Sequence, residues 1–162
     1  MTERLWAPWR MEYIKSAAEV QPPGCIFCGL LTSGDDRDRL VLFKNLHAAV
    51  IMNKYPYNNG HVLVMPRAHV GRFENLNREA FLALNDLLLR TINTLDRVLK
   101  PHAMNVGMNL GLDAGAGIPD HMHYHVVPRW TGDTNFMPVI SETKVISQHV
   151  LDTYDLLKPH FG

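Results

Sequence analysis

The sequence predicts an α+β domain in which five strands form an antiparallel sheet, with one long helix and flanking helices packed mainly on one face. Two observations lead to this fold class. Short apolar segments rich in β-branched residues recur between turn residues, and one much longer segment has apolar residues at helical spacing. The chain has 162 residues, which suits one domain with its own core.

The chain is expected to begin with an N-terminal arm at residues 1–24, followed by a single domain at residues 25–162. The arm contains Trp6 and Trp9 and ends in the breaker run Q-P-P-G. Large aromatic residues more often pack than bind ligands, so both tryptophans are expected to pack onto the domain or a second subunit. Stacking on a base is the alternative. A short helical turn at residues 25–31 opens the domain.

The next part of the chain predicts a three-stranded meander, with strands at residues 40–45, 48–53 and 61–65. The connections N-L-H and K-Y-P-Y-N-N-G consist largely of residues typical of turns. Neighbouring strands are therefore expected to pair antiparallel.

Residues 77–99 carry the helical pattern, with apolar residues recurring every three or four positions. Asn77 is typical of a helix N-cap, and Pro101 lies beyond the end. The wide apolar face predicts that this helix covers the sheet. The remaining predicted elements are two strands and a final amphipathic segment, at residues 104–110, 121–127 and 141–157.

The charge balance restricts the class of partner. Sixteen basic and sixteen acidic side chains give a formal net charge of zero, so no nucleic-acid or membrane-surface footprint is expected, and local groups must hold any bound anion. The first residues lack an apolar leader, and no segment approaches the roughly 20 apolar residues of a membrane span. We expect a cytoplasmic protein without nucleic-acid or membrane partners.

Three histidines recur at every second residue in the segment H-M-H-Y-H-V-V-P. In a strand this spacing puts all three imidazoles on one face, about 6 to 7 Å apart. Three core histidines, or a chance metal-binding tract, are the alternatives, but buried histidines without partners are costly. We therefore favour the interpretation that the three histidines bind or transfer a ligand. The residues expected to point into the core are Met122, Tyr124 and Val126.

The segment resembles the signature of the histidine-triad (HIT) superfamily, His-φ-His-φ-His-φ-φ with φ apolar. Upstream, G-H-V-L-V-M-P-R-A-H resembles that superfamily's second block, and the two blocks with the intervening helix cover most of residues 25–130. The following P-R-W-T-G-D-T-N-F-M is more similar to the bacterial branch related to diadenosine tetraphosphate phosphorylases and hydrolases. The resemblance implies a HIT-like fold and, as is usual in the family, a homodimer.

The resemblance also implies nucleotidyl transfer through a covalent nucleotidyl-histidine. His123 matches the family's nucleophile, and imidazole can be both nucleophile and acid or base near neutral pH. His125 and His61 match positions that contact the phosphate oxygens. The implied substrate is a dinucleoside polyphosphate such as diadenosine tetraphosphate, with phosphorolysis and hydrolysis both open. A nucleoside phosphoramidase and a non-catalytic nucleotide-binding module are the alternatives.

For the nucleotide, Asn53 matches the ribose-binding acidic residue of the family, and Asn109 matches an asparagine of the phosphate region. Turn formation is the alternative for both. The family's base pocket maps onto Ile26, Phe27 and Met52, for which ordinary core packing is the alternative.

A glycine-rich loop at residues 111–117 precedes the triad. It lacks the Gly-Lys-Ser/Thr ending of a P-loop, yet backbone amides at Gly115 and Gly117 are candidate phosphate donors because of their position. The chain has G-I-P-D where better-known family members carry Gln-Ser or Gln-Thr, which argues against the phosphoramidase. After the triad, the loop beyond Trp130 either closes over the distal end of the substrate or forms a surface turn.

The two cysteines, Cys25 and Cys28, form a C-x-x-C, which is half of a tetrahedral zinc site. Some bacterial HIT proteins and the related galactose-1-phosphate uridylyltransferases complete such a site with two histidines, which match His69 and His121. The resemblance therefore implies a structural Zn²⁺. A redox pair, which lacks its βαβ context here, and two inert buried thiols are the alternatives.

Overall fold

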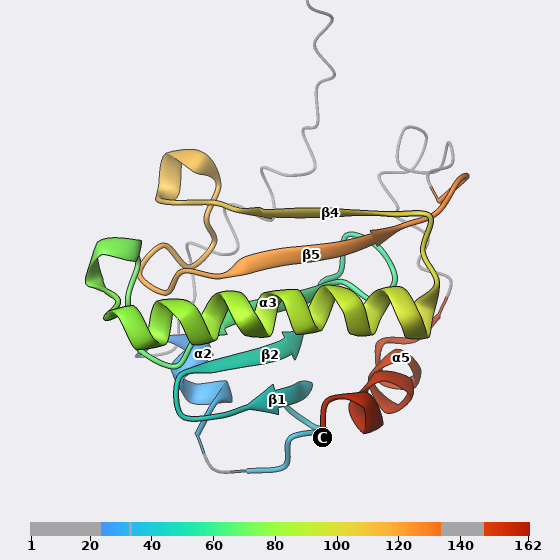
Figure 1. The fold of residues 1–162 in the computed structure, drawn as a ribbon, viewed down its shortest axis with the longest axis horizontal. Helices are drawn as coiled ribbons and strands as arrows, with labels where there is room; N and C mark the ends of the chain where they lie inside the picture. The colour runs from blue at the N-terminus through green and yellow to red at the C-terminus, as the bar shows by residue number, and fades with distance from the viewer. Residues whose placement is uncertain (1–23, 33, 134–147) are drawn as a thin grey trace, which may run out of the picture.

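The computed structural model describes residues 24–32, 34–133 and 148–162, in which five strands form one antiparallel sheet in the order β1-β2-β3-β5-β4. Figure 1 shows this sheet with the long helix α3 across its front. The α+β class and the five-stranded sheet are therefore confirmed. The strands are β1 (Val41–Lys44), β2 (Ala48–Met52), β3 (Val62–Pro66), β4 (Ala103–Met108) and β5 (Tyr124–Arg129).

The order of the strands positions the triad segment. The first three strands form the expected meander, and the chain then crosses through α3 to β4 at the far edge. From there β5 returns between β3 and β4 and pairs with both. His125 within β5, and His121 and His123 just before it, therefore lie in the middle of the sheet.

The long helix α3 (Arg78–Leu99) agrees closely with the predicted segment. The side chain of Asn77 caps its start by accepting a hydrogen bond from the backbone N–H of Ala80 at 2.8 Å. The apolar face of α3 packs against one face of the sheet, where alternate strand residues such as Val50, Val64 and Val126 are buried. Burial of this face supplies the main core.

A smaller core lies on the opposite face. Helix α2 (Ile26–Leu30) is the expected short helical turn, and its Phe27 packs onto Ile51, Leu63 and Met65. Strands β2 and β3 are thus buried on both faces, which fits their continuous apolar sequence. The triad histidines lie on this second face.

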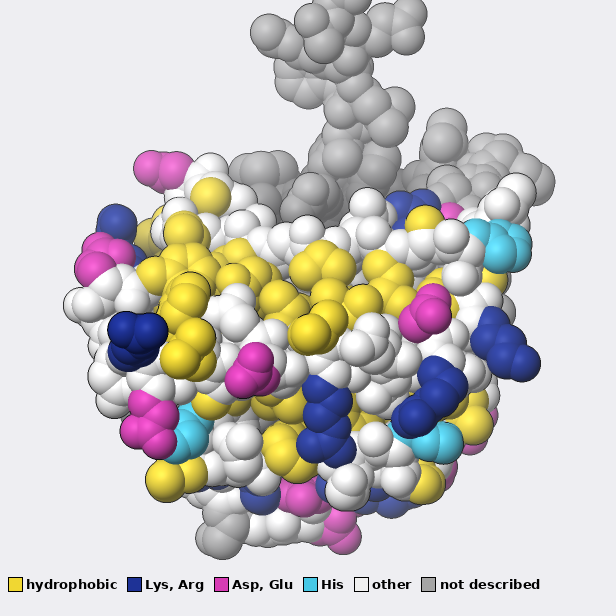
Figure 2. Space-filling view, in the orientation of Figure 1, with side chains coloured by type: hydrophobic (Ala, Val, Ile, Leu, Met, Phe, Trp, Pro, Cys, Tyr) yellow, Lys and Arg dark blue, Asp and Glu magenta, His cyan; other side chains and the backbone are white. Residues whose placement is uncertain are grey.

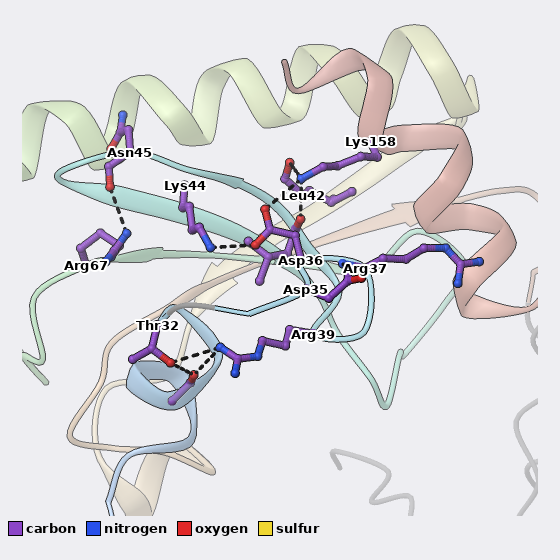
Figure 3. Close-up of polar contacts among 12 residues, drawn as sticks. Thr32, Asp35, Asp36, Arg37, Arg39, Leu42, Lys44, Asn45, Arg67 and Lys158 are labelled. Atoms are coloured by element: carbon purple, nitrogen blue, oxygen red, sulfur yellow. Dashed lines mark hydrogen bonds and ion pairs between the residues drawn. The ribbon is translucent and has the colours of Figure 1, made fainter.

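The C-terminal elements cover the β1 edge of the sheet. These are α5 (Val150–Leu157) and the 3₁₀ turn η3 (Lys158–His160). The Lys158 ammonium donates to the carbonyl oxygens of Val41 and Leu42 at 2.9 and 3.1 Å and lies 3.4 Å from Asp36, as Figure 3 shows. These contacts occupy acceptors along the β1 edge, whereas no described element pairs with the outer edge of β4.

The fifth strand starts later than expected, at Tyr124 instead of His121. Pairing between β3 and β5 stops at Val64 and Tyr124, and β3 ends at Pro66, which has no N–H to donate. Met122 instead donates its N–H to the carbonyl oxygen of Val70. Alternation persists through this segment, because Met122 and Val126 are buried in the main core as predicted.

Some predictions fall outside the described residues. These are the arm with Trp6 and Trp9, the end of the loop after Trp130, and the first part of the final amphipathic segment. Among the described residues, the structure contains no helix with the length and apolar character that a bilayer crossing requires.

Candidate active site and metal centre

The structure brings the three predicted catalytic histidines together on the face opposite α3. His61 precedes β3, His123 precedes β5, and His125 lies within β5, opposite Leu63 of β3. The Nε2 of His61 lies 3.0 Å from the Nδ1 of His125. The ring centroids of His123 and His125 are 4.9 Å apart.

Backbone groups determine which ring nitrogen of His61 carries the proton. The N–H of Tyr57 donates to the Nδ1 of His61 at 3.0 Å, and the Nδ2 of Asn53 lies 3.3 Å from the same atom. Because Nδ1 accepts, the proton of neutral His61 is on Nε2, which donates to the Nδ1 of His125. The proton of His125 is then on Nε2, where it can be donated to a ligand.

His123 has the opposite arrangement. Its Nδ1 lies 2.9 Å from the carbonyl oxygen of His121, which can only accept, so Nδ1 carries the proton. The Nε2 of His123 therefore keeps its lone pair. The side chain is 6 % exposed, and burial lowers its pKa, so the ring is neutral and nucleophilic at neutral pH.

The other two histidines are also held neutral. Burial, with the neighbouring His125 and His123, lowers the pKa of His61 to about 3. Burial and the neighbouring His123 lower the pKa of His125 to about 4. All three rings thus act as hydrogen-bond donors and acceptors, and a bound phosphate is the group that the Nε2–H of His125 is suited to contact.

The predicted base pocket is only partly assembled. Phe27 of α2 lies edge-on to His123, with ring centroids 4.9 Å apart, and Ile26 is 43 % exposed beside it. Met52 is not brought to the histidines, because the alternation of β2 turns it into the core beneath α3. The structure therefore corrects the expected pocket at Met52, where packing accounts for its placement.

Asn53 and Asn109 both make local hydrogen bonds. Asn53 accepts from the N–H of Tyr55 at 3.0 Å, which is the turn role that its type suggests, while its amide reaches His61. Asn109 donates to the carbonyl oxygen of Gly115 at 3.2 Å and so holds the glycine loop. Gly115 has φ +87°, which favours glycine, and Gly117 is exposed.

Two residues that border His125, outside the group of three histidines, were not found from the sequence. Tyr57 places its ring 5.7 Å from that of His125, with 18° between the planes. Gly107 of β4 pairs with His125 across the sheet. Neither carries a signal of its own, because a tyrosine in a turn and a glycine in a strand are common. The register of β4 against β5 reveals Gly107, and the ring contact with His125 reveals Tyr57.

The four predicted metal ligands also converge. The ligand atoms of Cys25, Cys28, His69 and His121 all lie within 4.8 Å of one another. The Nδ1 of His121 lies 3.4 Å from the Sγ of Cys25 and 3.6 Å from that of Cys28, and the Nδ1 of His69 lies 3.5 Å from the Sγ of Cys28. The thiols come from Cys25, which precedes α2 as its N-cap, and from Cys28 within α2, and the segments after β3 and before β5 supply the imidazoles.

These distances fit a tetrahedral zinc ion. Bonds of about 2.3 Å to sulfur and about 2.0–2.1 Å to nitrogen, at the tetrahedral angle, place the two ligand atoms about 3.6 Å apart. The Nε2 of His121 lies 2.9 Å from the carbonyl oxygen of Pro66, so Nε2 carries the proton and Nδ1 keeps its lone pair. The residues present can therefore hold a metal ion.

A sequence profile of the HIT domain matches residues 35–132, which include His61 and the whole triad but not the cysteines of α2. The chain belongs to the HIT domain family. The chain is 36 % identical over 160 residues to the AP-4-A phosphorylase of Mycobacterium tuberculosis, covering 96 % of this chain and 82 % of that protein. It is 31 % identical over 93 residues to the asymmetrical bis(5'-nucleosyl)-tetraphosphatase of Schizosaccharomyces pombe, covering 57 % and 50 % of the two chains.

Solved structures support the HIT fold. A Zn-bound histidine triad family protein from Mycobacterium smegmatis superposes with a TM-score of 0.65 at 20 % identity, covering 85 % of this chain and 93 % of that one. A hypothetical histidine triad nucleotide-binding protein from Sulfolobus tokodaii gives a TM-score of 0.64 at 23 % identity, covering 85 % and 89 %.

Proposed function

We propose that this HIT-domain protein is an enzyme that splits dinucleoside polyphosphates, with diadenosine tetraphosphate as substrate, through a covalent nucleotidyl-histidine. The observation that carries the proposal is the pairing of a bare Nε2 on His123 with an Nε2–H donor on the neighbouring His125. The 36 % identity to an AP-4-A phosphorylase over nearly the whole chain supports the substrate class.

In the first step, the Nε2 lone pair of His123 forms a bond to the α-phosphorus, and the bond from that phosphorus to the bridging oxygen breaks. The leaving group is ATP, which takes the electron pair of the broken bond. The nucleotidylated ring becomes cationic and keeps its Nδ1–H on the carbonyl oxygen of His121, which stabilises the charge. His125 donates to a non-bridging oxygen as charge develops there.

In the second step, an acceptor oxygen attacks the same phosphorus, and the electron pair of the phosphorus–nitrogen bond returns to Nε2 of His123. Hydrogen phosphate as acceptor yields ADP and loses its proton to solvent, while water yields AMP. We propose phosphate as the acceptor because a relative that matches nearly the whole chain is a phosphorylase.

The placement of the predicted residues supports our proposal for the remaining contacts of the substrate. Phe27 and Ile26 border the side of His123 that faces α2, where the base of the transferred nucleotide binds. Asn53, at the end of β2, contacts the ribose, and the loop held by Asn109 offers backbone amides at Gly115 and Gly117 to the phosphates.

Cys25, Cys28, His69 and His121 hold Zn²⁺, for which the set of thiolates and imidazoles is suited. With these four protein ligands the ion would be structural, because it would tie α2 to the segment after β3 and the segment before β5. His121 thereby holds its carbonyl oxygen against His123. The paired thiols require a reducing compartment, which supports a cytoplasmic location.

We further propose a homodimer, consisting of two copies of one domain that comprises residues 25–162. The outer edge of β4 has no described partner strand, and Figure 2 shows hydrophobic side chains gathered in a band between α3 and β4. Phe81, Leu82, Leu89 and Val106 are exposed on these elements. A second copy paired along β4 would cover both the free strand edge and the hydrophobic band. A light-scattering mass equal to that of one chain would contradict the homodimer.

The enzymatic proposal is tested by product analysis after incubation with diadenosine tetraphosphate, with and without isotopically labelled inorganic phosphate. We expect ATP and ADP only when phosphate is present, with the label in the β-phosphate of ADP. AMP and ATP formed without phosphate would retain the covalent mechanism but replace phosphate by water. Absence of turnover under both conditions would refute the proposal, and adenosine 5'-phosphoramidate would then be tested.

A further inference from the structure

A cleft with a volume of about 370 Å³ opens on the histidine face beside His125. Its walls are formed by residues of β4 and by Tyr57. Sites for small molecules commonly have volumes of about 300 Å³ and more, so the cleft has room for a nucleoside. Its lining includes Tyr57, Asn105, Gly107, Asn109, His125 and Val127.

The position of the cleft relative to the nucleophile follows from the strand order. In the register of the sheet, Gly107 pairs with His125 and Asn105 pairs with Val127, so the cleft extends along β5 away from His123. Helix α2 with Phe27 lies against the other side of His123. The reacting phosphate at His123 is thus flanked by α2 on one side and by the cleft on the other.

The walls of the cleft have the chemistry of a nucleobase site. Tyr57 lines the cleft, is 52 % exposed and has its ring nearly parallel to that of His125. A Cβ added at Gly107 would meet no atom within 4 Å, which shows open space directly across from His125. Val127 adds an apolar floor. Aromatic and apolar surfaces of this kind bind bases by stacking.

Asn105 adds a polar contact at the same wall. Its Oδ1 accepts a hydrogen bond from Arg129 at 2.8 Å, which fixes the orientation of the amide and leaves its N–H groups as donors. At the end nearer the triad, Asn109 borders the cleft and holds the glycine loop. The polyphosphate chain can therefore pass from His123 along His125 and Asn109 into the cleft.

We propose that this cleft binds the nucleoside of the leaving nucleotide, with the Tyr57 ring stacking on its base. The inference rests on the proposed function and assigns the second half of the dinucleoside substrate to a surface formed by β4 and the turn before His61. It makes Tyr57 a determinant of specificity for substrates that carry two nucleosides.

The experiment compares diadenosine tetraphosphate with adenosine 5'-tetraphosphate, which has the same reacting phosphate and polyphosphate chain but lacks the second nucleoside. For Tyr57→Ala we expect KM for the dinucleoside to rise at least about fivefold, as for loss of one stacked base. KM for the mononucleoside substrate should stay within about twofold. Tyr57→Phe, which keeps the ring, should behave as the wild type with both.

Tyr55→Ala is the matched control, because Tyr55 lies in the same turn, is 66 % exposed and does not line the cleft. It should leave both substrates unaffected. Gly107→Val is a second test, since the added side chain enters the open space of the cleft; it should also raise KM for the dinucleoside alone. Equal losses with both substrates for Tyr57→Ala would mean that the ring only supports the histidines, and would overturn the assignment.

A binding measurement separates this inference from the proposed function. Calorimetry on His123→Ala protein needs no turnover. In that background, Tyr57→Ala should raise the Kd for diadenosine tetraphosphate at least about fivefold and leave the Kd for AMP unchanged. If the wild type turns over no substrate yet this selective loss is found, the proposed reaction fails and the subsite stands. If turnover is found and both ligands bind equally with and without the ring, the subsite fails alone.

Discussion

His121 and His123 are separated by one residue and lie on the same face of the sheet, yet the structure gives them opposite tautomers. A backbone carbonyl takes the Nε2 proton of His121, so that Nδ1 faces two thiols. A backbone carbonyl takes the Nδ1 proton of His123, so that Nε2 keeps its lone pair. One histidine is thereby suited to a metal and the other to phosphorus.

The comparison shows that residue type alone does not determine the role of a histidine. Both rings are buried, and burial lowers the pKa of both, so each is neutral and has one donor and one acceptor nitrogen. What differs is the position of the accepting carbonyl, from Pro66 in one case and from His121 itself in the other. The fold distributes the two roles through the backbone.

The largest expected effect separates the two roles by substitution of the nucleophile. His123→Ala should lower kcat by about a thousandfold or more, because no other described ring offers a bare Nε2 beside His125. Metal content should remain unchanged. Steady-state kinetics and metal analysis measure both; His160→Ala, an exposed histidine far from the triad in the fold, is the control. Comparable turnover by the alanine variant would assign the nucleophile elsewhere.

The next largest expected effect comes from substituting one of the four predicted metal ligands. Cys28→Ser should abolish stoichiometric zinc and lower the free energy of unfolding by several kcal/mol, because the four ligands come together only in the folded chain, so that metal binding stabilises it. Denaturant unfolding and metal analysis are the measurements. Chelator treatment of the wild type should reproduce the loss. Freshly purified, chelator-free protein without metal would rule out the zinc site.

The row of three histidines could be predicted from local spacing, whereas the grouping of His61, His69 and the cysteines with that row came from the family resemblance. The alternation of H-M-H-Y-H put the rings on one face, and the structure keeps that face even though the regular strand starts at Tyr124. The tautomers could not be predicted, since the carbonyl of Pro66 and the N–H of Tyr57 reach the rings only in the folded chain. Met52 was wrongly assigned to the base pocket. Successive residues alternate between the two faces of the sheet, so Asn53 reaches His61 while Met52 points into the core beneath α3.

A smaller effect tests the hydrogen-bond chain behind the catalytic pair. His61→Leu should lower kcat about a hundredfold, because the Nδ1 of His125 loses its donor and its proton is no longer held on Nε2. His61→Gln, whose amide offers both an acceptor and a donor, should recover most of the activity. Nitrogen chemical shifts of His125 report its tautomer directly; equal activity and unchanged shifts in the leucine variant would show that His61 has only a packing role.

The smallest effect is a pH dependence of stability. The folded pKa values of His61 and His125, about 3 and about 4, lie below the ordinary histidine pKa of 6.5, chiefly because both rings are buried. The groups facing His61 are His125, His123 and the Tyr57 ring, which include no carboxylate. As the pH falls below 6.5, His61 and His125 bind protons in the unfolded chain but stay neutral in the folded chain. The free energy of unfolding that they contribute above pH 6.5 is therefore progressively lost. Each histidine contributes a slope of about 1.4 kcal/mol per pH unit.

Denaturant unfolding between pH 6.5 and about 4.5 isolates this contribution, because ordinary carboxylates titrate mainly below that window. His61→Gln should reduce the slope by the share of one histidine, about 1.4 kcal/mol per pH unit, whereas His160→Gln should leave it unchanged. A slope that is the same in both variants would mean that His61 protonates without cost in the folded state. The hydrogen bonds that His61 makes with the Tyr57 N–H and with His125 would then not oppose its protonation.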